Sequence, residues 1–203
     1  MEKTICFRKF EERDIDFIYK CKNNEKLNKF IVGDWHPFSY DEAEKWVHGC
    51  MKDDSSYKFW AVCTNDEEKN IIGWVSLSDI DITLQTANFH GIVIGNPDFQ
   101  DGTAWVECYQ LIFEVVFSKM KFRRLTGSHL SIHPSSGIIA ACMFMQGDYI
   151  EKNYTVKDGI NADLIHVSID SDTYFKHLNN GDYEYNKILN RMLNKYKHSN
   201  KLR

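Results

Sequence analysis

The chain has 203 residues, 43% of them hydrophobic and 27% charged, and a formal net charge of −4. This length allows one domain with a substantial core, and the composition is ordinary for a globular protein. No apolar run approaches the roughly 18 residues of a membrane span, and the first residues lack the apolar core of a signal peptide. The net negative charge argues against general affinity for nucleic acid. We therefore expect a cytoplasmic protein with neither membrane nor nucleic-acid partners.

The first quarter of the chain predicts one strand and two helices. Apolar and polar residues alternate in "KTICFRKF" (3–10), which predicts a strand. Apolar residues recur at helical spacing over 14–31, with Asp14 as the cap. The segment 39–51 predicts a second helix, in which Ser39 is the N-cap and Glu42, three residues on, completes a capping box.

The middle of the chain is rich in strands. Segments 58–64, 70–80 and 87–95 each predict a strand, and the polar turn "NDEEKN" joins the first two as a hairpin. A helix is predicted over 104–120 and a strand over 123–132. The next segment, 134–147, predicts a helix that ends at Gly147.

The last part of the chain predicts a strand pair at 148–156 and 162–169, then helical residues over 172–198 with an interruption at 179–181. Consecutive strands indicate antiparallel pairing, and the strand–helix–strand step over 88–132 indicates a parallel pair joined by a right-handed crossover. We expect an α/β fold with a mixed, mostly antiparallel central sheet of about seven strands flanked by helices. We divide the chain into a domain at 1–170 and a C-terminal helical appendage at 171–203.

The six cysteines and eight histidines form no metal-binding pattern. No C-x-x-C pair occurs, and each cysteine lies in or beside an apolar segment, which is typical of buried thiols in a reducing compartment. His129 and His133 have H-x-x-x-H spacing, but their segment predicts a strand, where residues four apart are about 13 Å apart. We expect neither a disulfide nor a metal site.

Several short segments, in this order, resemble one acetyltransferase family. They are "FRKFEERDIDFIY" with Arg8 and Asp14, "NIIGWVSLSDID" with Gly73, "HGIVIGNPDFQ", "FRRL" at 122–125, and "DGINADLIHVSI". Together with the order of elements, they resemble the GNAT N-acetyltransferase fold, and in particular the Rim-type branch that includes ribosomal-protein alanine acetyltransferases. The resemblance covers residues 4–170 and implies acetyl-CoA as the acyl-donor substrate.

The family's phosphate-binding motif is present in altered form. The motif is Arg or Gln, two residues, Gly, one residue, then Gly or Ala, with a glutamate seven positions after the first. Gln100 and Glu107 have that separation, so the resemblance assigns coenzyme contacts to Gln100, Asp101, Gly102, Thr103, Ala104 and Trp105. Thr103 and Trp105 stand where the family has small residues, and a Cβ there obstructs a closely approaching phosphate. Both a remodelled cradle and weakened coenzyme binding remain open.

The resemblance also implies where the chemistry occurs. The backbone of Ile92, Val93 and Ile94 would meet the pantetheine arm and the thioester. The glutamate that many members use as a general base is replaced by Phe89. His90 is the adjacent ionisable group, and histidine is a residue type that can act as a base near neutral pH, although a purely structural strand histidine is the alternative.

Two residues are candidates for protonating the leaving thiolate. Ser136 lies at the start of the helix predicted over 134–147, and Tyr149 lies just beyond its end. Helix capping by Ser135 or Ser136, and core packing of Tyr149, are the structural alternatives. In the family, the loop between the first two helices lines the acceptor pocket, so Trp35, His36 and Phe38 are candidate substrate contacts. Neither cysteine near this region, Cys108 or Cys142, is expected to act as a nucleophile.

We predict an N-acetyltransferase in which an amine attacks acetyl-CoA directly, with a small-molecule acceptor such as an aminosugar. The loop at 32–40 favours this acceptor, because its aromatic side chains suit sugar rings and its one formal charge is Asp34. A peptide α-amine, as in the alanine-type enzymes, is the alternative acceptor. A non-catalytic GNAT-fold binding protein, or an interaction module that uses the basic C-terminal helix, is the alternative function. A homodimer is compatible with these features.

Overall fold

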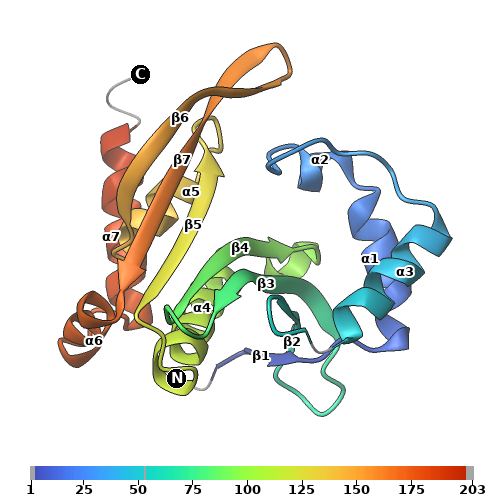
Figure 1. Cartoon of the computed structure of the whole chain (residues 1–203), viewed down its shortest axis with the longest axis horizontal. Coiled ribbons are helices and arrows are strands. Elements are labelled where there is room, and N and C mark those ends of the chain that lie inside the picture. The colour runs from blue at the N-terminus through green and yellow to red at the C-terminus, as the bar shows by residue number, and fades with distance from the viewer. Residues whose placement is uncertain (1–2, 53, 200–203) are drawn as a thin grey trace.

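The computed structural model describes residues 3–52 and 54–199 (Figure 1). Within these ranges, no helix combines the length and apolar character needed to cross a membrane. The strands are β1 (Ile5–Arg8), β2 (Lys58–Thr64), β3 (Ile71–Asp81), β4 (Thr86–Ile94), β5 (Arg124–Leu130), β6 (Gln146–Lys157) and β7 (Ile160–Asp170). The α-helices are α1 (Ile15–Lys22), α2 (Glu25–Asn28), α3 (Tyr40–Met51), α4 (Thr103–Phe113), α5 (Ser136–Cys142), α6 (Ser171–Asn179) and α7 (Tyr185–Ser199).

The strands form one seven-stranded sheet in the order β1-β2-β3-β4-β5-β7-β6. Neighbouring strands are antiparallel except for β4 and β5, which are parallel and are connected through α4. The predicted α/β fold with a mixed, mostly antiparallel sheet is therefore confirmed. Two consecutive strands can pair in parallel only if a crossover connection returns the chain to the same end of the sheet, and α4 provides this connection.

Helices cover both faces of the sheet, and each face has its own core. On one face α1 and α3 pack over β2 and β3, around Ile18, Val47 and Trp74. On the other face α4, α5 and the C-terminal helices enclose a larger core that includes Ile112 and Phe113 (Figure 1). Strand alternation explains the division, because successive side chains of β3 point to opposite faces.

The predicted capping box is present at the start of α3. The Ser39 hydroxyl accepts a hydrogen bond from the Glu42 backbone N–H, and the Glu42 carboxylate accepts from the Ser39 backbone N–H at 2.7 Å. The single helix predicted over 14–31 is instead divided. α1 ends at Lys22, and α2 begins after Asn24, whose side chain accepts from the Leu27 backbone N–H.

The prediction that a helix runs to Gly147 is wrong. α5 ends at Cys142, and Phe144 adopts a left-handed φ of 63° that turns the chain into β6 at Gln146. Gly147 is therefore a strand residue paired with Val167. A glycine near a helix end predicts a helix stop only when it supplies the left-handed turn, and here a phenylalanine supplies it.

The C-terminal helices share the core of the rest of the chain. Tyr174 of α6, Ile188 of α7 and the connecting Tyr183 are buried in the larger core, and the rings of Tyr174 and Tyr183 each meet the ring of Phe113 edge-on. The interruption expected at 179–181 lies between the two helices, where Gly181 has a φ of 66°.

Candidate active site

A cleft opens where two strands of the sheet separate. β4 and β5 pair only through residues 86–89 and 124–127. Beyond that point they diverge around a cleft of about 640 Å³, whose two sides include residues 92–94 and residues 127–130. Beyond this point β4 and β5 are no longer hydrogen-bonded to each other. The backbone groups on their facing edges are therefore available to a ligand.

A β-bulge in β4 lies at the point of divergence. Val75 pairs with Ile92 and Leu77 with Phe89, so β4 has one more residue than β3 between these pairs. Gly91 adopts a φ of 106° within the bulge, a conformation that glycine accepts readily. Bulges bend a strand and re-aim its side chains, and His90 is here exposed and lines the cleft.

The two walls of the cleft meet again at their far ends. The Lys29 ammonium lies 2.8 Å from the Asp158 carboxylate in the β6–β7 turn, and Lys157 donates a hydrogen bond to the Gly33 carbonyl. The rings of Phe30 and His133 are also in contact, 5.2 Å between centroids. The cleft is therefore a passage bounded by strand pairing at one end and by these contacts at the other.

The turn after β4 leads directly into α4. Gln100 Nε2 donates to the Ile94 carbonyl at 2.8 Å, which folds the turn back on the strand. Gly102 is the N-cap residue, with a left-handed φ of 100°, and the Asp101 carboxylate accepts from the Thr103 backbone N–H at 2.8 Å. The first-turn N–H groups of a helix lack intrahelical acceptors, so those of Ala104 and Trp105 can serve an anion.

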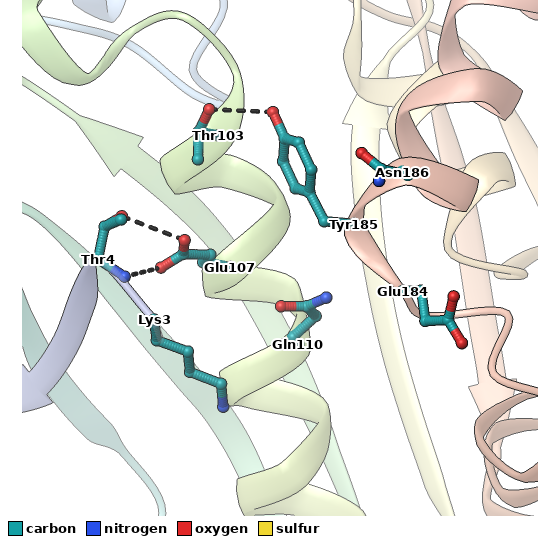
Figure 2. A pocket seen from close by; sticks show the side chains of 8 residues that line it. All are labelled: Lys3, Thr4, Thr103, Glu107, Gln110, Glu184, Tyr185 and Asn186. Atoms are coloured by element: carbon teal, nitrogen blue, oxygen red, sulfur yellow. Dashed lines mark hydrogen bonds between the residues drawn. The ribbon is translucent and has the colours of Figure 1, made fainter. Parts of the chain in front are cut away.

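Two residues of the altered motif serve the fold rather than the cleft. The Thr103 hydroxyl lies 3.1 Å from the Tyr185 hydroxyl at the start of α7 (Figure 2). The buried Glu107 carboxylate accepts from the Thr4 and Ile5 backbone N–H groups at 2.8 and 3.1 Å. Figure 2 shows both side chains at a separate pocket, which lies between Lys3 and Thr4, α4 and the start of α7. The volume of this pocket is about 410 Å³. Thr103 thus lines this second pocket, whereas Trp105 lines the cleft.

His133 and Ser136 lie on the β5 side of the cleft. The ring Nδ1 of His133 accepts from the backbone N–H groups of Ser135 and Ser136, at 3.3 and 3.1 Å, and so caps α5. Neither serine side chain makes a capping bond, so the predicted serine cap is wrong and the histidine takes its place. Burial, with a smaller effect of His129, lowers the pKa of His133 to about 4, so its ring is neutral at pH 7.

Other residues predicted for the site lie elsewhere. Tyr149 is on the edge strand β6, is 58% exposed and stacks on His166 rather than lining the cleft. Tyr154, further along the same strand, does line it. The placement of Tyr149 differs from expectation because α5 ends early and β6 begins at Gln146.

The predicted acceptor loop reaches the cleft through Val32, but its three candidate substrate contacts lie beside the cleft. Trp35 donates its indole N–H to the Lys22 carbonyl at 2.8 Å, and the rings of His36 and Phe38 stack on each other. None of these three side chains lines the cleft, which is bordered on this side by Lys22, Trp46 and Trp74. The sequence offered one signal for Lys22, which follows Ile18 by four residues and so lies on the buried face of α1.

No cysteine is among the described residues that line the cleft. All six cysteines are free thiols, and burial raises the pKa of Cys21 to about 11 and that of Cys50 and Cys63 to about 12. Burial also raises the pKa of Cys108 and Cys142. Thiols with raised pKa values are poor nucleophiles at neutral pH.

Within the described ranges, no group of three or more His, Cys, Asp or Glu side chains is placed to hold a metal ion.

The splayed parallel strands, the bulge in β4 and the strand–turn–helix that follows define an acetyltransferase architecture. The family model of the acetyltransferase (GNAT) domain matches residues 4–142. The chain belongs to the GNAT acetyltransferase family and is an acyltransferase, with acetyl-CoA as the acyl donor. No curated protein sequence matches the chain.

Solved structures share this fold. Spermidine N-acetyltransferase from Vibrio cholerae, in complex with CoA and spermine, has a TM-score of 0.74 at 19% identity, covering 85% of this chain and 98% of that one. A GCN5-related N-acetyltransferase from Brucella melitensis has a TM-score of 0.70 at 18% identity, covering 86% and 79%. A GNAT-family acetyltransferase from Bacillus anthracis has a TM-score of 0.69 at 18% identity, covering 83% and 96%.

Proposed function

We propose that this enzyme acetylates the primary amine of a small molecule in the cleft between β4 and β5. The observation that carries the proposal is the divergence of these strands beyond residues 89 and 127, which leaves backbone groups of Ile92, Val93 and Ile94 facing a cleft. The pantetheine arm of acetyl-CoA would take the place of the missing strand partner. Its pyrophosphate would bind at the turn 100–105, where the helix dipole favours an anion by about 0.3–1 kcal/mol.

The reaction would be direct attack. The amine nitrogen forms a bond to the thioester carbonyl carbon, the carbon–sulfur bond breaks, and coenzyme A leaves as a thiolate that gains a proton. Backbone N–H groups along β4 can stabilise the oxyanion of the tetrahedral intermediate. Ser136 is the hydroxyl from α5 that lines the cleft, and we assign it as the proton donor to sulfur.

The attacking amine must first lose a proton. No Asp or Glu is among the described residues that line the cleft, whereas Lys22 and three histidines are. An ammonium that enters this cleft leaves water and approaches another cation, and both effects lower its pKa. His90, exposed at the bulge, is placed to accept the proton and pass it to solvent.

The same cleft favours a small-molecule acceptor over a peptide N-terminus, which is the acceptor of the Rim-type enzymes. Contacts join the 29–33 segment to the β6–β7 turn, and we expect them to hinder an extended peptide more than a small molecule. The Vibrio cholerae neighbour is a spermidine acetyltransferase. Carboxylates are the natural partners of a polycation, and none is among the described residues that line this cleft, so we propose a different acceptor here.

Two measurements test the proposal. Acetyl-CoA at a hundredfold excess over its Kd should stabilise the protein by about 2.7 kcal/mol, and a panel of small amines should release coenzyme A. Replacement of His90 by Gln should lower kcat by about 10²-fold, the lower range for loss of a general base. Coenzyme binding without turnover on any amine would favour a non-catalytic protein, and acetylation of peptides alone would favour the Rim-type alternative.

A further inference from the structure

Lys22 holds its ammonium among three aromatic rings at the wall of the cleft. Its Nζ lies 4.6 Å from the ring centroid of Trp46, 5.2 Å from that of Trp74 and 5.3 Å from that of Phe38. The rings come from α3, from β3 and from the segment before α3, so three separate parts of the chain converge on this one cation. We call Lys22 and these three rings the lysine cage.

Within the part of the chain that the structure describes, the ammonium in the lysine cage has no anionic partner. Among the described residues, no carboxylate and no hydrogen-bond acceptor is paired with Lys22 Nζ, although Lys22 lines the cleft. Cation–π contacts favour the charge, but they do not use the three N–H donors of the ammonium. Burial lowers the pKa of Lys22, which is the expected result of removing a cation from water without a counter-ion.

The described residues that line the cleft carry formal charge of one sign only. Lys22 is its one Lys or Arg side chain, Asp and Glu are absent from the described lining residues, and the other titratable nitrogen groups are His90, His129 and His133. A ligand that complements this lining carries a negative charge at one end. The remainder of the wall beside Lys22 is aromatic, which suits an aliphatic or sugar body.

We propose that the acceptor is a primary amine that also carries an anionic group, a carboxylate or a phosphate, and that Lys22 is the residue that recognises this group. The inference rests on the proposed function and narrows its acceptor class. The anionic group would bind the ammonium of the lysine cage, while the amine at the other end of the molecule reaches the thioester at β4. The cage belongs to the α1 and α3 face of the sheet, opposite the α4 face that would hold the coenzyme.

The test uses pairs of amines that differ in the anionic group alone. Glucosamine 6-phosphate is compared with glucosamine, and β-alanine with β-alaninamide, with spermidine as the polycation. Each probe is assayed for coenzyme A release and is also titrated by calorimetry into protein saturated with coenzyme A, so that binding is measured without turnover. The wild-type protein should prefer the anionic member of one pair by at least about tenfold in kcat/KM and Kd, or about 1.4 kcal/mol.

Substitutions at position 22 then assign the preference. Lys22→Met keeps the apolar stem against the rings and should remove the preference for the anionic amine, measured as Kd, while the affinity for acetyl-CoA stays unchanged. Lys22→Arg should retain part of it. The phosphate and carboxylate pairs identify which anion the site takes.

Several results would overturn the inference. One is a preference of the wild-type protein for spermidine or for the member of each pair that lacks the anionic group. Another is that neither anionic amine binds. A third is that Lys22→Met keeps the full preference for the anionic amine. An equal loss of acetyl-CoA affinity in Lys22→Met would also overturn it, because Lys22 would then bind a phosphate of the coenzyme. Lys22-dependent binding of an anionic amine without any acetyl transfer would support the inference and refute the proposed function. The comparison of amines on wild-type protein stands even if a variant does not fold.

Discussion

Arg8 and Asp14 illustrate what a single ion pair does in this fold. The Arg8 guanidinium donates two hydrogen bonds of 2.7 Å to the two carboxylate oxygens of Asp14, which is 1% exposed. The Asp14 side-chain hydrogen bond raises the pKa of Arg8. The pair ties β1 to the start of α1. Their place in the sequence was recognisable from the family pattern, but their mutual contact was not.

We expect Asp14→Ala to destabilise the protein by about 3–5 kcal/mol, because it leaves the largely buried guanidinium of Arg8 without its partner. Urea unfolding measures the loss. Arg13→Ala is the matched control, since the bond of Arg13 to Glu11 is at the surface and its removal should leave the midpoint nearly unchanged. Equal effects of the two substitutions would contradict this account.

His133 should make stability depend on pH. Its pKa is lowered from 6.5 to about 4 by burial, so the folded protein keeps the ring neutral while the unfolded chain binds a proton in this range. The stabilisation is therefore complete above about pH 6.5 and is lost as the pH falls toward 4, and partial exposure limits it to roughly 1–2 kcal/mol. His133→Asn, which keeps an acceptor for the cap of α5, should flatten this part of the profile in urea titrations. His36→Gln, at an exposed ring, is the control.

At the scale of elements, the turn into α4 differs from the family pattern yet is well built. The Thr103 hydroxyl bonds to Tyr185 and to the Asp101 carboxylate, and Gly102 supplies the left-handed conformation one position earlier than the family pattern. We propose that these bonds hold a remodelled turn and not an obstructed one.

The double substitution Thr103→Gly and Trp105→Gly should therefore weaken acetyl-CoA binding, although it restores the family's small residues. It removes the anchor to Tyr185 and a ring that lines the cleft. Calorimetric titration with acetyl-CoA gives the result directly. Binding tighter by about tenfold, or 1.4 kcal/mol, would show instead that these side chains obstruct the phosphates.

How far the sequence predicted these elements depended on the range of the interactions. The capping box of Ser39 and Glu42 spans three residues, and its local pattern was sufficient. The end of α5 was mispredicted because Phe144 adopts a conformation that its residue type rarely takes. The structural role of Glu107 was not predictable, since its partner Thr4 is 103 residues away in the sequence.

At the scale of the molecule, the C-terminal helices are part of the main core. Ile188→Ala should cost about 2–5 kcal/mol, because Ile188 is 1% exposed among core residues. Leu193→Ala on the same helix is the control, at 48% exposure, and should have little effect. Thermal or urea unfolding of both variants checks this. Equal losses would mean that α7 is stabilised in some way other than burial of this face.

The overall sheet was predictable because alternation and the order of elements restrict how strands pair. The cleft itself was less so. Residues 92–94 and Ser136 were predicted for it and do line it, whereas Lys22, Trp46 and Trp74 come from elements whose convergence no local pattern indicates. The sequence therefore pointed to the neighbouring loop with Trp35 as the acceptor pocket. In the structure, the Trp35 indole N–H donates to the backbone carbonyl of Lys22.

The contacts between Lys29 and Asp158, and between Lys157 and Gly33, have a topological consequence. They close the chain into a ring around the cleft, and in the proposed reaction the coenzyme and the acceptor would enter this ring from opposite sides. A conjugate that links coenzyme A covalently to an acceptor would then be threaded through the ring, with a bulky group on each side. Such a molecule could leave only when the ring opens, and its escape should be far slower than that of either half alone.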